Sequence, residues 1–222
     1  MYDRWASVVP KEELAQYCKA GFGGRMGFGS KVAVVAVDVT NRYVTSQYSM
    51  AATHPIDPVI KRIAVLLEAA RAARLPIFYS HPARGTDIAR GLYNHKVVSW
   101  KKPEDKGADE WPKLIKPHPE DTLLPKNKSS IFHDTPLAAY LTYLRVDTLV
   151  LCGLSTSGCI RTAAQDAFAS NFRAMVVRDC VADRSVTAHN WCLFDMDMRS
   201  ADVVESDDVL EVFAEIAAAQ EA

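Results

Sequence analysis

Residues 32–37 form an unbroken run of small and β-branched apolar side chains, Val-Ala-Val-Val-Ala-Val, which ends at Asp38. A half-exposed strand would alternate apolar and polar residues, so the run predicts a strand that is buried on both faces. Strands of this kind are typical of parallel sheets, because helices cover both sides of such sheets. This one segment therefore favours an α/β fold.

The rest of the chain alternates strand-like and helix-like patterns. Further strands are expected at 77–80, 148–153, 174–178 and 201–204. Helices are expected at 11–20, from 57 onward, and at 135–144, 159–170, 185–197 and 206–219. The helix that starts at Asp57-Pro58 would turn one apolar face inward, made of Val59, Ile63, Leu66, Leu67 and Ala70. The alternation predicts βαβ units in a three-layer, doubly wound, mostly parallel sheet with helices on both faces.

Two regions lie outside this alternation. Residues 1–30 are expected to form a peripheral N-terminal arm, and 31–222 a single domain. The glycine-rich stretch 21–29 precedes a strand, whereas a phosphate-binding loop follows one, so a flexible arm is the expectation there. Residues 82–121 are expected to be mostly loop with short helical pieces. Because long insertions often build sites or subunit contacts, Trp100 and Trp111 within it would suit an interface.

The composition argues against several classes of protein. A formal net charge of -1 gives no electrostatic reason to expect a nucleic acid or an anionic membrane as partner. No apolar run reaches the length of a membrane span, and no signal peptide is visible. Five scattered cysteines without a CxxC pair argue against a disulfide framework or a zinc ribbon. A cytoplasmic protein that acts on a small molecule is expected.

One cysteine lies where chemistry is expected. In Gly153-Leu-Ser-Thr-Ser-Gly-Cys159 a buried strand ends, a small polar turn follows, and a helix begins near Cys159. The free N–H groups and the positive dipole end of a helix stabilise a thiolate there. The same N–H groups could hold the oxyanion of an attacked carbonyl. The segment therefore suits acyl transfer, although a cysteine packed inertly under the sheet has the same pattern.

A thiol nucleophile needs a base, and an amide leaving group needs a proton. Asp38 is a candidate because it ends a buried strand, although it could equally anchor a loop. Lys126 could stabilise negative charge or could be a solvated surface lysine. Six histidines lie far from Cys159 in sequence but could approach it in space: His54, His81, His95, His118, His133 and His189.

Together these segments resemble the isochorismatase-like superfamily of cysteine hydrolases. Its pattern is an Asp that ends the first strand, a Lys before Ser-x-Phe-x-x-Thr-x-Leu, and a Cys that opens a helix after a Gly-Thr-rich turn. The chain has Val37-Asp38, the stretch 126–137 and the stretch 153–159. The resemblance spans roughly residues 20–215. It is strongest to the N-carbamoylsarcosine amidohydrolase branch, through 21–29, 158–161, 183–184 and 190–197, and Ser157-Gly-Cys is also similar to maleamate amidohydrolases.

The resemblance implies a role for each of these residues. Cys159 attacks the carbonyl carbon, Asp38 takes the thiol proton and passes it to the departing ammonia, and Lys126 supports both. Water then hydrolyses a covalent acyl- or carbamoyl-enzyme. A cis peptide bond between Leu154 and Ser155 would direct the backbone N–H groups of Ser155 and Cys159 at the oxyanion.

Two further residues are candidates for binding substrate. Arg184 corresponds to an arginine that binds the substrate carboxylate, which suits a guanidinium fork. Alternatively, Arg184 forms a surface ion pair with Asp183. Asn41, just after the first strand, is the second candidate.

The resemblance thus implies an amidohydrolase that needs no cofactor and no metal, because the Asp-x-His cluster of nicotinamidases is missing around Asn41 and His54. The expected reaction releases ammonia from a small N-carbamoyl amino acid such as N-carbamoylsarcosine. Maleamate or another small linear amide or ureido compound is the alternative substrate. A homo-oligomer, dimer or tetramer, is expected. A non-catalytic binding or assembly protein and an isochorismatase are disfavoured, because neither requires the Cys159, Asp38 and Lys126 set.

Overall fold

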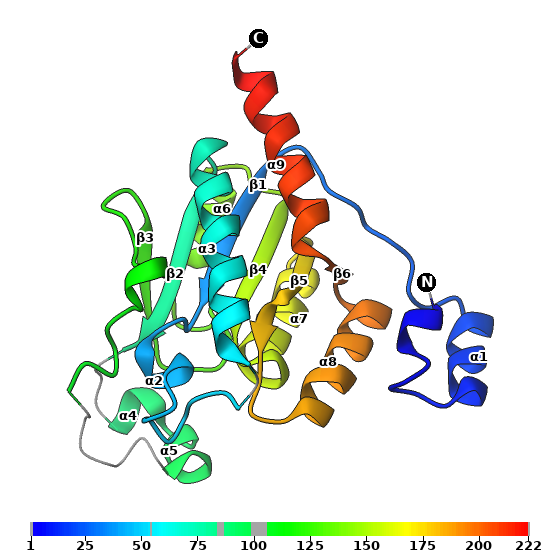
Figure 1. The fold of residues 1–222 in the computed structure, drawn as a ribbon, viewed down its shortest axis with the longest axis horizontal. Coiled ribbons are helices and arrows are strands. Elements are labelled where there is room, and N and C mark those ends of the chain that lie inside the picture. The colour runs from blue at the N-terminus through cyan, green and yellow to red at the C-terminus, as the bar shows by residue number, and fades with distance from the viewer. Residues whose placement is uncertain (1, 54, 84–86, 99–105, 222) are drawn as a thin grey trace.

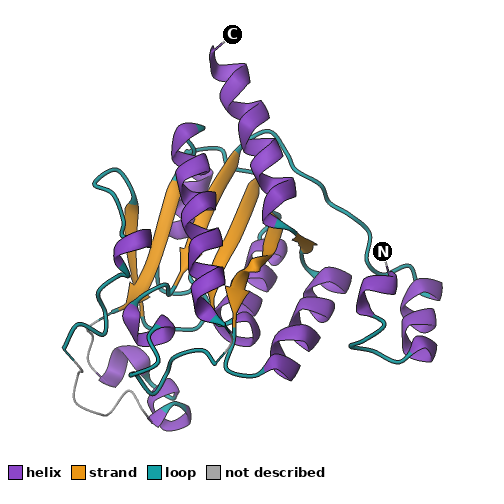
Figure 2. Cartoon of the chain, in the orientation of Figure 1, coloured by secondary structure: helices purple, strands orange, loops and turns teal. Residues whose placement is uncertain are grey.

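The computed structural model describes residues 2–53, 55–83, 87–98 and 106–221, with a six-stranded sheet at their centre (Figure 1, Figure 2). The strands lie in the order β3-β2-β1-β4-β5-β6, and every neighbouring pair is parallel. Their bounds are β1 (Val32–Val37), β2 (Ile77–Pro82), β3 (Thr122–Lys126), β4 (Thr148–Leu154), β5 (Arg173–Ala182) and β6 (Asp202–Val204). The predicted doubly wound parallel sheet is confirmed.

Helices cover both faces of the sheet, as Figure 1 shows. They are α3 (Ile56–Ala72) and α9 (Ser206–Glu221) on one face, and α6 (Leu137–Tyr143), α7 (Arg161–Ala169) and α8 (Val186–Arg199) on the other. Odd-numbered residues of β1 join the core under the second group, and even-numbered residues join the core under the first. Both faces are therefore buried, which explains the unbroken apolar run.

The remaining helical pieces are short: η1 (Tyr2–Trp5), α1 (Lys11–Lys19), α2 (Asn41–Val44), α4 (Asp87–Arg90), α5 (Tyr93–Lys96), η3 (Lys113–Ile115) and η4 (Thr156–Ile160). Four residues of the predicted inner face of α3 are buried as expected: Ile63, Leu66, Leu67 and Ala70. Val59 is only half-buried, and Ile60, which was not predicted, is buried instead. In the described part of the chain, no helix has both the length and the apolarity that crossing a membrane requires.

The N-terminal arm makes hydrogen bonds to the edge of the sheet. Its glycine-rich segment has no helix or strand, but the backbone N–H groups of Met26 and Gly27 donate to the Asp202 carboxylate at the start of β6. Arg4 donates to the carbonyl of Val203 in the same strand, at 2.9 Å. The arm is therefore fixed along the β6 edge of the sheet.

Trp111 packs inside its own chain. Its ring meets the rings of Tyr79 and His81 edge-on, with centroid distances of 6.4 and 5.6 Å. Trp100 lies outside the described residues. The expected interface role of this segment therefore gains no support from Trp111.

The strand order places a crevice at one end of the sheet. The chain leaves β1 toward β2 on one side and returns as β4 on the other, so the neighbours β1 and β4 form the switch point of the topology. Ligands bind outside the carboxyl ends of such strands. In Figure 1 these ends point to the lower side of the molecule, where α2, α4 and α5 lie. Asp38 and the turn before Cys159 both emerge there.

Candidate active site

Asp38, Lys126 and Cys159 meet at this crevice, although they come from the ends of three different strands. Lys126 Nζ lies 2.7 Å from Asp38 Oδ2 and 3.3 Å from Cys159 Sγ. All three side chains are buried. Lys126 is the last residue of β3, a strand that the sequence reading did not recognise, and its long side chain reaches across from the sheet edge. The structure thus brings together all three predicted catalytic residues.

Asp38 is oriented by its backbone and by a neighbouring serine. Its φ of 52° lies in the left-handed region, which aspartate tolerates better than most residues. Ser80 in β2 accepts the Asp38 backbone N–H at 3.0 Å and donates to Asp38 Oδ1 at 2.8 Å. Sequence reasoning missed Ser80, and only the pairing of β1 with β2 would have suggested it.

The Cys159 turn is tighter than a simple helix start. A cis peptide bond joins Leu154 to Ser155, as the resemblance implies, and residues 156–160 form one π-helical turn before α7. Such turns occur frequently at functional sites. Gly153 has a φ of 111°, and a Cβ there would lie 2.1 Å from the Val37 carbonyl oxygen. Only glycine lets β4 pass this close to β1.

Cys159 is a neutral thiol in this environment. Burial raises its pKa to about 12, the Lys126 ammonium opposes that rise, and the Asp38 carboxylate adds to it and accepts the thiol hydrogen bond. The loss of solvation thus outweighs the nearby positive charge and favours the protonated thiol in the free enzyme.

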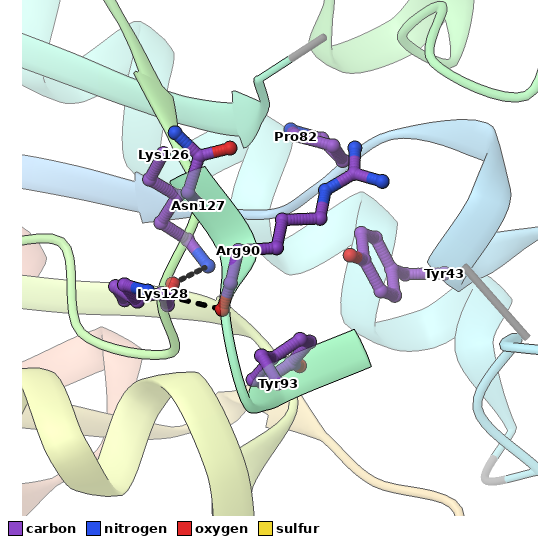
Figure 3. Close-up of a pocket in the computed structure, with 7 residues that line it drawn as sticks. All are labelled: Tyr43, Pro82, Arg90, Tyr93, Lys126, Asn127 and Lys128. Carbon is purple, nitrogen blue, oxygen red and sulfur yellow. Dashed lines mark hydrogen bonds between the residues drawn. The ribbon is translucent and has the colours of Figure 1, made fainter. Parts of the chain in front are cut away.

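Lys126 is held as a cation. Burial alone would lower the pKa of its ammonium, but Asp38 and Cys159 together raise it above its ordinary value. Its third partner is the carbonyl of Lys128, at 3.1 Å, and Figure 3 shows the side chain directed there. The three N–H donors thus face a carboxylate, a sulfur and a carbonyl. Lys126 can stabilise charge without giving up a proton.

A cavity of about 260 Å³ opens beside Cys159. Tyr43, Met50, Tyr93 and Val97 supply much of its wall, and Arg184 lies on the same cavity. Tyr43 also borders the smaller pocket around Lys126 that Figure 3 shows. Burial, with the nearby Asp38 and Cys159, raises the pKa of Tyr43 well above 10, so its phenol stays neutral.

Two buried side chains hold the Cys159 turn from outside. Asp183 accepts the backbone N–H of Ser157 at 2.6 Å, and His189 Nδ1 lies 2.8 Å from the Thr156 hydroxyl. Asp183 also accepts the backbone N–H of Arg184 at 2.7 Å. Sequence reasoning gave neither residue this role, because both are far from the turn in sequence. Asp183 follows β5, and His189 lies on α8.

The profile of the isochorismatase domain matches residues 32–208. The chain belongs to the isochorismatase family. N-carbamoylsarcosine amidase of Arthrobacter sp is 32% identical over 203 residues, which cover 88% of this chain and 76% of that protein. Maleamate amidohydrolase of Pseudomonas putida is 33% identical over 201 residues, covering 88% and 93%.

Solved structures agree with this assignment. N-carbamoylsarcosine amidase from Thermoplasma acidophilum superposes with a TM-score of 0.68 at 28% identity, over 80% of this chain and 98% of that one. An isochorismatase family protein from Desulfovibrio vulgaris reaches a TM-score of 0.75 at 24% identity, over 84% and 100%, and shows the shared fold. The chain is thus an isochorismatase-family hydrolase, and its sheet and helices superpose on those of these solved structures.

Asn41 makes its hydrogen bonds to residues 107–110. Its side-chain amide donates to the carbonyl of Gly107 at 3.0 Å, and its backbone N–H donates to the carbonyl of Glu110 at 2.8 Å. Asn41 is not among the described residues that line the cavity. Asn41 thus anchors residues 107–110, and its role in binding substrate stays a prediction.

Two of the candidate histidines, His81 and His189, contact other residues than Cys159. His189 contacts Thr156, His81 packs on Trp111, and His54 lies outside the described residues. Over the described ranges, no group of three or more His, Cys, Asp or Glu side chains is arranged to hold a metal ion.

Proposed function

We propose that this isochorismatase-family hydrolase is a cysteine amidohydrolase that cleaves an amide C–N bond and releases ammonia from a small N-carbamoyl amino acid such as N-carbamoylsarcosine. The observation that carries the proposal is the position of Lys126 Nζ between Asp38 and Cys159. Arg184 lines the same cavity, and its guanidinium group is suited to binding a substrate carboxylate. The amidase names of the relatives from Arthrobacter and Pseudomonas support the same bond type.

The first half-reaction forms a covalent intermediate. Asp38 accepts the thiol proton as Cys159 Sγ attacks the carbamoyl carbon, so a free thiolate need not accumulate. The backbone N–H groups of Ser155 and Cys159 would receive the developing oxyanion. The tetrahedral species then expels its terminal nitrogen, which takes the proton from Asp38 and leaves as ammonia. Throughout these steps the Lys126 ammonium offsets the negative charge that moves between oxygen and sulfur.

The second half-reaction restores the enzyme. Asp38 takes a proton from a water molecule as that water attacks the carbamoyl carbon of the thiocarbamate. The C–S bond breaks, and the proton returns from Asp38 to Cys159. The product is an N-carboxy amino acid, which loses carbon dioxide to leave the amine. Neither half-reaction changes an oxidation state, since the first transfers the carbamoyl group to sulfur and the second hydrolyses it.

Maleamate is the second candidate substrate. The match to maleamate amidohydrolase covers 93% of that protein, and the same attack on a primary amide would release ammonia and a dicarboxylate. A non-catalytic binding protein would require no nucleophile next to a cationic partner, so the Lys126–Cys159 contact argues against it.

The test measures ammonia release from N-carbamoylsarcosine and, separately, from maleamate. Three proteins are compared: the unaltered chain, Cys159→Ala, and Cys18→Ala as a matched control at an exposed cysteine. Release from one substrate that disappears only in Cys159→Ala supports the mechanism and chooses the substrate. Release that persists in Cys159→Ala would overturn it, and release from neither acid would overturn both named substrates.

A further inference from the structure

We propose that Asp183 is a positioning residue that fixes the separation between Arg184 and Cys159 and thereby selects the length of the substrate. The inference rests on the proposed function, in which Arg184 holds the carboxylate and Cys159 attacks the carbamoyl carbon. It concerns a carboxylate that touches neither the scissile bond nor the proton transfer.

Strand pairing brings the two ends of the substrate site together. β5 runs beside β4, with Ala182 opposite Leu154. Asp183 directly follows β5 and is only 3% exposed. Ser155 directly follows β4 and opens the turn that carries Cys159. Asp183 is therefore placed between the nucleophile turn and Arg184 by the register of the sheet.

Each oxygen of this carboxylate holds one side. Asp183 Oδ2 accepts the backbone N–H of Ser157 at 2.6 Å, and Oδ1 accepts the backbone N–H of Arg184 at 2.7 Å. Ser155, at the N-cap of the turn, makes no side-chain capping bond, so Asp183 provides that bond to Ser157 from the neighbouring strand. One rigid group thus joins the nucleophile's turn to the backbone of the arginine.

Arg184 is also held on its other side. Its guanidinium donates to the carbonyl of Met50, and its own carbonyl accepts from the Thr53 hydroxyl at 2.5 Å. Asp183 and Thr53 thus hold the backbone of Arg184, and the Met50 carbonyl holds its guanidinium. The site then favours one spacing between a carboxylate and the attacked carbonyl.

Substrate length is sensitive to that spacing. N-carbamoylglycine and N-carbamoyl-β-alanine differ by one methylene between the carboxylate and the ureido nitrogen. The extra carbon shifts the reacting carbonyl by roughly 1 Å, and a displacement of that size can cost about 100-fold in rate. We expect the unaltered enzyme to prefer one of the two acids by about that factor.

Asp183→Asn is the informative substitution. Asparagine keeps the shape but offers one acceptor oxygen, and its NH₂ group would face a backbone N–H, so one of the two bonds is lost. The matched control is Asp179→Asn. Asp179 lies in β5, the strand that Asp183 follows, and likewise accepts a backbone N–H, that of Ser206 at 2.9 Å, but this bond ties β5 to α9.

The experiment compares kcat/KM for the two acids in all three proteins. Supporting evidence is a length preference that falls below about tenfold in Asp183→Asn and is unchanged in Asp179→Asn. The proposal is overturned if the unaltered enzyme shows no preference, or if Asp183→Asn slows both acids by the same factor. Should Asp183→Asn not fold, Asp183→Glu keeps both oxygens but displaces them, and the same ratio decides.

A second readout separates this inference from the proposed function. In a Cys18→Ser background, which removes the exposed thiol, Cys159 is alkylated with iodoacetate and with 3-iodopropionate, which place the carboxylate at two distances from the reactive carbon. If neither ureido acid is hydrolysed, the proposed function fails and the alkylation ratio decides the role of Asp183. A ratio that changes in Asp183→Asn but not in Asp179→Asn supports that role, and an unchanged ratio overturns it.

Discussion

Ser80 and Asp38 hydrogen-bond to each other in both directions. The serine Oγ accepts the aspartate backbone N–H at 3.0 Å and donates to Oδ1 at 2.8 Å. Both residues are buried, so water cannot replace either bond. The other carboxylate oxygen faces Lys126 at 2.7 Å. Asp38 is thereby fixed in the orientation in which it can take a proton from Cys159.

Replacing Ser80 should weaken the base without removing it. In Ser80→Ala the ionised carboxylate loses a donor worth about 1.5–3 kcal/mol, so kcat should fall about 10- to 100-fold. Ser206→Ala is the control, since it removes another buried serine that donates to an aspartate, Asp179. Equal activity loss in both variants would contradict the assignment.

Removing the cation should affect both stability and activity. Lys126→Met leaves the Asp38 carboxylate buried without its ion-pair partner, which costs about 3–5 kcal/mol in the free energy of unfolding. Ammonia release should fall at least about 1000-fold, because the charge that offsets the oxyanion is gone. Urea denaturation and an ammonia assay measure the two effects. The neighbouring Lys128→Met should retain the Asp38 pair, and a Lys126→Met enzyme as active as that control would refute the role.

The raised pKa of Cys159 predicts how the free enzyme reacts with iodoacetamide. A pKa near 12 keeps the thiol protonated at neutral pH, so its alkylation rate should rise about tenfold per pH unit from pH 7 to 10 without a plateau. A small free thiol should level off near its ordinary pKa of about 8.5. Mass spectrometry of the modified peptide follows Cys159 alone. A plateau for Cys159 below pH 8 would show a resting thiolate instead.

Arg184 should govern substrate binding more than turnover. In Arg184→Gln the substrate carboxylate loses a charged partner, so KM should rise at least about 30-fold while kcat changes little. Arg178→Gln is the control, because Arg178 pairs with Glu205 on the surface. A fall in kcat at constant KM would place Arg184 in the chemical step.

The sheet was predictable because its inner strands are unbroken apolar runs, and such runs have few alternatives. β3 was not predicted, because its residues alternate between exposed and buried at the sheet edge and include Pro125. Local pattern also could not distinguish the π-helical turn before α7 from a normal helix start. Both depend on how neighbouring strands approach one another.

The site was predictable where a single segment shows its own chemistry, as with Cys159 after its glycine turn. Asp38 and Lys126 became convincing only together, through the family resemblance, because each alone has an ordinary structural explanation. Ser80 and Asp183 were out of reach, since their partners come from adjacent strands. The bond from Asn41 to Gly107 was likewise not predictable, because Gly107 is supplied by a distant loop.

The attachment of the N-terminal arm to β6 bears on the exposed edge of the sheet. β6 is an edge strand, and a bare edge offers unpaired backbone groups to the sheet of another molecule. Arg4 donates a hydrogen bond to the carbonyl of Val203, while the backbone N–H groups of Met26 and Gly27 donate to the Asp202 carboxylate. The arm therefore acts as a cover against edge-to-edge aggregation, and shortening the chain from this end would expose a template for misassembly far from the catalytic crevice.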